Sequence, residues 1–104
     1  MDIAQVAQHL SADEKAEYLE LIKMFESAGW TILKQKFADL REGAQAAFDY
    51  AETWEANRYA KGQRDALDMF LQTEEGIEKY FELIATTRVA EQQENLAEAD
   101  RSME

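Results

Sequence analysis

From Trp30 onward, apolar side chains recur along the chain in alternating steps of three and four residues. The series is Trp30, Leu33, Phe37, Leu40, Ala44, Ala47, Ala51 and Trp54. This spacing is that of a heptad stripe, which predicts a helix with one continuous apolar side. The large residues come first and alanines follow beside Gly43, so a neighbouring helix can approach closely along residues 43 to 51.

A separate helix is predicted before this stripe. Ser11 followed by Glu14 is a capping-box signature, so the helix should begin near Ala12. Its apolar positions are Tyr18, Leu21, Ile22 and Phe25. This apolar stripe stops at residues 27–29, and Trp30 begins a stripe in a different helical register. The change indicates a break or kink between two helices.

The second half of the chain continues in helical patterns. A turn is expected within residues 50–55, where Thr53 can cap a new helix and let the stripe bury itself in a hairpin. The new helix carries Tyr59, Gly62, Ala66, Met69 and Phe70 on one side. Thr73 is expected to cap a further segment, in which Ile77, Tyr80 or Phe81, and Ile84 repeat. After Arg88 the apolar density falls sharply.

Composition supports helix throughout, because the chain has no proline, only four glycines, and mostly good helix formers. We therefore predict an all-α fold, either a helical hairpin or a small three- to four-helix bundle, with an extended C-terminal helix. Residues 1–88 should form one helical domain and residues 89–104 an acidic helical tail. The predicted hairpin core consists of Trp30, Leu33, Phe37, Leu40 and Trp54.

The tail has two interpretations. Val89, Leu96 and Met103 are spaced one heptad apart, with Ala85 and Ala99 near the same face. A thinly apolar, acidic segment of this kind is typically a frayed, solvent-exposed helix. Alternatively, the three heptad positions mediate self-association.

Charge limits the class of partner. The chain holds 22 acidic and 11 basic residues, for a formal charge of −11, so it repels phosphate backbones and anionic lipids. Proteins are the expected partners, and no membrane association is expected. The absence of cysteine and of a signal-peptide pattern at the N-terminus favours an intracellular or virion protein over a small secreted one.

One basic stretch departs from this charge pattern. Arg58, Lys61 and Arg64 recur every three residues beside Trp54 and Tyr59, which could stack nucleic-acid bases. Against that function, the three carboxylates Glu55, Asp65 and Asp68 are spaced to form ion pairs with them along the helix. We favour a helix surface with internal ion pairs. The same patch could receive the acidic tail of a neighbouring copy.

Catalytic and metal-binding patterns are missing from the sequence. His9 is the only histidine, and Glu14 and Glu17 lack the Glu-x-x-His partners of carboxylate-bridged metal bundles. There is no Asp-rich calcium loop, and the glycines belong to no phosphate-binding loop. We expect no enzymatic activity, no metal and no cofactor.

Two short segments carry a family resemblance. Gly29-Trp-Thr-Ile-Leu33, followed after a long helix by Arg58-Tyr-Ala-Lys-Gly-Gln-Arg-Asp-Ala-Leu67, resembles a group of small helical proteins encoded in tailed-bacteriophage genomes. In that group, a Gly-Trp and a Gly-x-x-x-Ala-Leu helix make a hairpin. The resemblance spans roughly Gly29 to Leu71. It implies a phage setting and transfers no catalytic residue.

Two functions are compatible with these observations. The first is a non-enzymatic virion or assembly component, such as an adaptor, a scaffold-like protein or an accessory protein. It would act through helix-mediated contacts, as a homo-oligomer or with other phage proteins. The second is an acidic phage inhibitor of a host or defence protein, which could imitate DNA. The mixing of acids with bases along residues 14–82 favours the first function.

Overall fold

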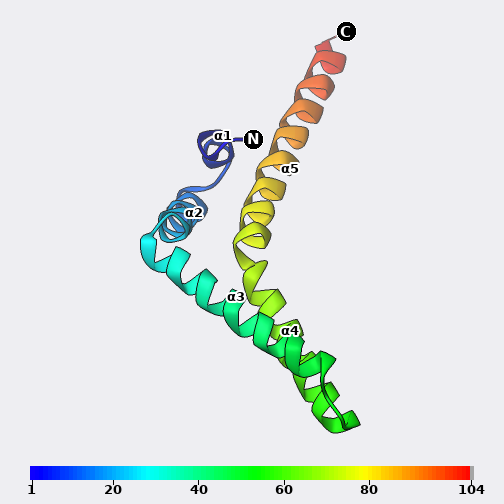
Figure 1. Cartoon of the computed structure of the whole chain (residues 1–104). Coiled ribbons are helices and arrows are strands. Elements are labelled where there is room, and N and C mark those ends of the chain that lie inside the picture. The colour runs from blue at the N-terminus through cyan, green and yellow to red at the C-terminus, as the bar shows by residue number, and fades with distance from the viewer. Residues whose placement is uncertain (104) are drawn as a thin grey trace. The chain divides into compact units, whose positions relative to one another are not determined.

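The protein is built from α-helices joined by short turns. The computed structural model describes residues 1–103, except for the side chain of Met103, and contains no strand within that range. The helices are α1 (Ile3–Gln8), α2 (Ala12–Phe25), α3 (Ala28–Asp49), α4 (Trp54–Leu71) and α5 (Thr73–Met103), shown in Figure 1. The predicted all-α fold with an extended C-terminal helix is confirmed.

Capping hydrogen bonds explain where the first helices begin. The Ser11 hydroxyl accepts from the Glu14 backbone N–H at 3.2 Å, and the Glu14 carboxylate accepts from the Ser11 N–H at 2.8 Å. This is the predicted capping box. Ser27 accepts from the Trp30 N–H at 3.1 Å and so fixes the break before α3. Thr53 accepts from the Ala56 N–H, also at 3.1 Å, and so fixes the turn before α4.

The start of α5 differs from the sequence prediction. Thr73 is the first residue of α5, but its hydroxyl donates to the carbonyl oxygen of Met69 at 3.0 Å. A side chain that donates backwards in this way satisfies a carbonyl at the end of α4. The expected capping role of Thr73 is therefore wrong.

The chain divides into two compact units. Unit 1 combines Met1–Lys23 with α5 from Gly76 onward, and unit 2 is Met24–Glu75. This division differs from the expected domain of residues 1–88 with a separate tail. Residues 89–103 continue α5 without a break, so they belong to the same helix as the residues that pack in unit 1.

Unit 1 is organised around aromatic and small side chains. Tyr18 of α2 packs on Phe81 of α5 with ring centroids 4.9 Å apart, and Ala85 beside them is fully buried. The other buried apolar residues of this unit are Val6, Ala7 and Ile22. Arg88 of α5 joins three elements, because its guanidinium donates to the carbonyl of His9 at 2.9 Å and to both carboxylate oxygens of Glu14.

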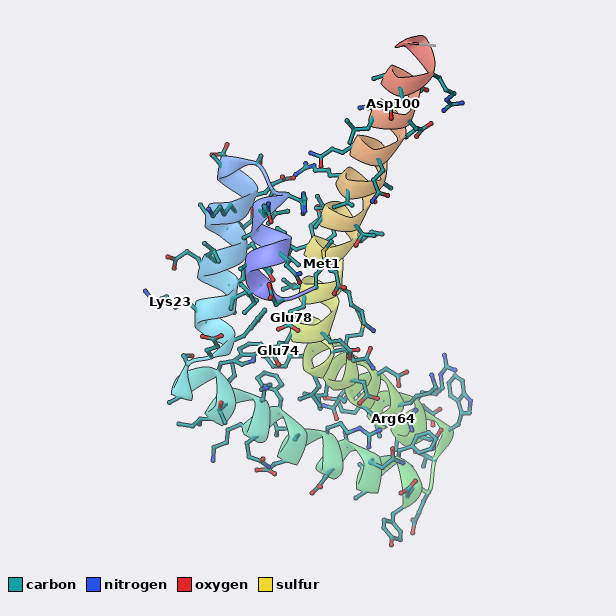
Figure 2. The ribbon with its side chains drawn as sticks, turned by 90° about the horizontal axis from the view of Figure 1, so that it is seen from above. Met1, Lys23, Arg64, Glu74, Glu78 and Asp100 are labelled. Carbon is teal, nitrogen blue, oxygen red and sulfur yellow. The ribbon has the colours of Figure 1, made fainter. Side chains whose placement is uncertain are left out.

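Unit 2 is a hairpin of α3 and α4. Phe37 and Phe70 stack with ring centroids 3.9 Å apart, and Trp30 packs on Phe70 at 5.7 Å. Two ion pairs run alongside these rings, Arg41 with Asp68 at 2.9 Å and Lys34 with Glu74 at 3.0 Å. Figure 2 shows the side chains between the two helices, with Arg64 and Glu74 labelled.

Candidate protein-binding surface

The hairpin carries an open groove formed by residues of α3 and α4. It has a volume of about 870 Å³. Its lining consists of Lys36, Asp39, Leu40, Gly43, Ala44, Ala47, Gln63, Ala66 and Leu67. Six of the nine lining residues are apolar, and four of these six are glycine or alanine.

Leu40 forms an exposed protrusion at the groove, and Gly43 leaves an open space beside it. Leu40 is 60% exposed, although the side chain is large and apolar. A methyl group built on Gly43 would meet nothing within 4 Å, so the space above this residue is empty within the chain. A protruding leucine beside an unfilled hollow suits a surface that another helix covers.

The structure corrects part of the predicted hairpin core. Trp30 is buried and Phe37 is half-buried, but Leu33 is 41% exposed, Leu40 60% and Trp54 71%. A single neighbouring helix covers only part of a wide apolar stripe, so Leu33 and Leu40 are left facing solvent. Trp54 is the first residue of α4, whereas the apolar stripe belongs to α3. The turn between the two helices therefore separates Trp54 from the rest of the stripe.

The basic stretch forms contacts within the hairpin. The Arg58 guanidinium lies 5.4 Å from the centre of the Trp54 ring, and Lys61 pairs with Asp65 at 3.0 Å. Arg64 lies over the Phe48 ring at 4.7 Å and also reaches Asp65 and Gln45. The expected ion pairing along the helix is therefore found at Asp65.

Asp68 does not pair with the basic stretch. It accepts from Arg41 of α3 at 2.9 Å, which raises the pKa of the Arg41 guanidinium. The expectation that Asp68 pairs along its own helix is wrong, because α3 offers a closer cation. The contact instead ties the two helices of the hairpin together beside the groove.

The tail residues lie along the last turns of α5. Val89 is half-buried, Leu96 is 67% exposed, and every residue from 90 to 102 is exposed. The side chain of Met103 lies outside the described residues. Self-association through Val89, Leu96 and Met103 stays a prediction.

A smaller cavity of about 380 Å³ lies in unit 1, lined by Met1, Asp2, Ile3, Val6, Tyr18, Ile22, Glu78 and Glu82. Burial, together with the negative charges of Glu78, Glu82 and Asp2, raises the pKa of Tyr18. The Met1 ammonium group pairs with Glu82 at 3.5 Å and supplies positive charge at this cavity.

Within the described part of the chain, no cluster of three or more histidine or acidic side chains is arranged to hold a metal. None of the described helices is long and apolar enough to cross a membrane. One buried polar atom, Nε1 of Trp30, has no hydrogen-bond partner. That indole is enclosed by the Phe25 and Phe70 rings, so it is part of the hydrophobic core of unit 2.

Sequence reasoning found the small residues along α3 but missed the groove that they help to form. Gly43 could have indicated the groove, because it is a glycine inside a long helix, with large stripe residues before it and alanines after it. The Arg88–Glu14 contact had no comparable signal, since the two residues are far apart in sequence. Comparison with known protein families, with characterised proteins and with solved structures found no match for this chain.

Proposed function

We propose that this protein is a non-enzymatic structural or assembly component that works through helix-mediated contacts with other protein chains. The observation that carries the proposal is the open apolar groove on the α3–α4 hairpin. The resemblance to small phage-encoded helical proteins supplies the setting, a virion or an infected host cell, where the contacts would be with further copies or other phage proteins.

The groove suits a protein partner because of what lines it. Leu40 offers a large exposed apolar side chain, and burying such a side chain contributes about 1.5 to 3 kcal/mol to association. The polar groups at the groove are Lys36, Asp39 and Gln63. One ammonium, one carboxylate and one amide form a polar rim of the kind that surrounds the apolar centre of protein interfaces.

The solution mass tests this function. Light scattering on a size-exclusion column, at about 0.05 M and about 1 M salt, should give a mass of two or more chains at both concentrations. Apolar contacts persist at high salt, whereas exposed ion pairs are screened. A monomer at both salt concentrations, across the micromolar range, would rule out self-assembly.

The acidic surface of α5 favours a second candidate function, inhibition of a basic host or defence protein. Glu91, Glu94 and Glu98 are exposed and lie on one face of the helix, since their spacing is three and four residues. An inhibitor of this type would be a monomer or a dimer whose binding weakens as salt rises. The triple change Glu91→Gln, Glu94→Gln and Glu98→Gln should then abolish competition with duplex DNA for that protein.

A further inference from the structure

We propose that the cavity of unit 1 binds an aliphatic diamine, with an ammonium group among its carboxylates and the carbon chain against its apolar wall. The inference goes beyond the proposed function and is independent of it, because the groove that carries that function lies in unit 2. The cavity is lined by residues of α1, α2 and α5 and by the two residues before α1. Two of its lining residues, Met1 and Glu78, are labelled in Figure 2.

Tyr18 is the polar side chain that points to a ligand. It is only 4% exposed, yet its hydroxyl makes no hydrogen bond within the described part of the chain. In the same part of the chain, Nε1 of Trp30 is the one fully enclosed polar side-chain atom without a partner, so solvent still reaches the Tyr18 oxygen. Since Tyr18 lines the cavity, this oxygen is an acceptor that opens into it. A mostly buried acceptor without a partner suits an N–H donor that comes from outside the chain.

The lining of the cavity carries net negative charge. It includes three carboxylates, those of Asp2, Glu78 and Glu82, and one ammonium, that of Met1. The Met1 ammonium pairs with Glu82 at 3.5 Å, so two negative charges remain without a positive charge in the lining. Burial raises the pKa of Tyr18 and the three carboxylates add to this effect, which shows that their field reaches the phenol. Two uncompensated negative charges favour a ligand with two positive charges.

The positions of the acceptors fit an ammonium group. Glu78 and Glu82 are four residues apart on α5, so their carboxylates lie on the same face of the helix. Like charges at this spacing repel each other, and a cation between them removes the repulsion. An alkylammonium group has three N–H donors, which match three acceptors, the two carboxylates and the Tyr18 oxygen. The Asp2 carboxylate already accepts from the Gln5 N–H at 2.8 Å, so it contributes charge.

The apolar wall distinguishes an amine from a metal ion. Val6 and Ile22 are buried beside the cavity, and Ile3 is 41% exposed at it. A carbon chain gains from contact with these side chains, whereas a hydrated divalent cation does not. Among the described residues, no acidic or histidine cluster is arranged to hold a metal. The volume of about 380 Å³ lies within the range of small-molecule sites, about 300 to 1,000 Å³.

The probe for the test is 1,4-diaminobutane, added to the full chain at about 0.1 M salt. Isothermal titration calorimetry measures the dissociation constant, and spectra of the isoleucine methyl groups locate the ligand. Ile3 and Ile22 line the cavity, whereas Ile32 is exposed on α3 in unit 2. We expect the methyl signals of Ile3 and Ile22 to shift on binding and that of Ile32 to stay unchanged.

Two double variants of α5 provide a matched control. Glu78→Gln with Glu82→Gln removes both carboxylates from the cavity. Glu94→Gln with Glu98→Gln makes the same change of charge at the same spacing, at exposed residues outside the cavity. We expect the first pair to raise the dissociation constant about tenfold or more, because hydrogen bonds to charged groups are strong, and the second to leave it within about twofold. Tyr18→Phe, which keeps the ring, should raise it about threefold or more. Circular dichroism verifies that each variant folds.

Three results would overturn the inference. The first is the absence of heat and of methyl shifts up to about 10 mM 1,4-diaminobutane. The second is an equal dissociation constant for the two double variants, which would show that the net charge of −11 attracts the amine without a site. The third is an equal affinity for Mg²⁺ with shifts of the same methyl signals, which would show that the cavity responds to charge alone.

Discussion

The two tryptophans allow one stability prediction to be made with an internal control. Trp30 is 7% exposed and packs between the Phe25 ring at 5.1 Å and the Phe70 ring at 5.7 Å. Trp54 is 71% exposed and has the Arg58 guanidinium over its ring. Replacing each by alanine therefore removes the same side chain from opposite environments.

We expect Trp30→Ala to lower the free energy of unfolding by about 3 to 5 kcal/mol, the usual range for a large buried aromatic. Loss of the two ring contacts accounts for about 1 to 3 kcal/mol of that, at about 0.5 to 1.5 kcal/mol each. Trp54→Ala should change the free energy by about 0.5 kcal/mol or less, as is usual for surface positions. A domain of this size is stable by only about 5 to 15 kcal/mol, so the difference is large.

Trp30→Phe refines the prediction. It keeps an aromatic ring between Phe25 and Phe70 and removes Nε1, a buried donor without a partner. An unsatisfied buried donor costs about 1 to 3 kcal/mol, and its removal offsets part of the lost ring volume. Trp30→Phe should therefore cost less than half as much as Trp30→Ala.

Urea unfolding of all three variants is followed by circular dichroism at 222 nm. This signal reports helix content and does not need the tryptophan side chains that the variants remove. The slope of the free energy against urea must stay constant for the comparison to hold. A loss below about 1 kcal/mol for Trp30→Ala, or an equal loss for Trp54→Ala, would refute the assignment of Trp30 to the core.

Three further changes have defined outcomes. Hydrogen bonding from Arg88 lowers the pKa of Glu14 from 4.5 to about 2. The ionised Glu14 carboxylate therefore stabilises the folded chain fully above about pH 4.5, and this contribution disappears as pH falls toward 2. The natural chain should thus lose more thermal stability than Glu14→Gln between pH 5 and about pH 2.5, and equal losses would contradict this. Ser27→Ala removes the cap of α3 and should cost about 0.5 to 2 kcal/mol in urea unfolding, against no change for the exposed Ser102→Ala. Ending the chain after Ala90 should lower the helical signal but leave the unfolding temperature within about 2 °C, because residues 91–102 are exposed. A larger fall would show that the tail supports the fold.

Local features of this fold were readable from the sequence. The starts of α2 and α4 follow from Ser11 and Thr53, because a cap depends on residues within one turn of it. The break at residues 27–29 was predicted from the change between two apolar patterns, and the turn at residues 50–55 from the ability of Thr53 to cap a helix. Thr73 was misjudged, since a hydroxyl at a helix start can accept from the next turn or donate to the previous one.

Features that depend on distant residues were not readable. The heptad stripe of α3 shows that one side is apolar, but it does not show how much of that side a single partner helix covers. Leu40 and Leu33 are exposed for that reason. The preference of Asp68 for Arg41 over its own helix, and the contact of Arg88 with Glu14, likewise depend on how helices meet in space.

The order of the two units along the chain has a consequence for synthesis on the ribosome. Unit 2 is one uninterrupted segment, Met24–Glu75, whereas unit 1 needs residues 1–23 together with α5 from Gly76 onward. The hairpin can therefore form as soon as its last residues leave the exit tunnel. Tyr18 can pack on Phe81 only after the whole hairpin has been translated, because Phe81 follows it in the chain. Closing the hairpin first brings residues 23 and 76 toward each other and shortens the loop that unit 1 must close.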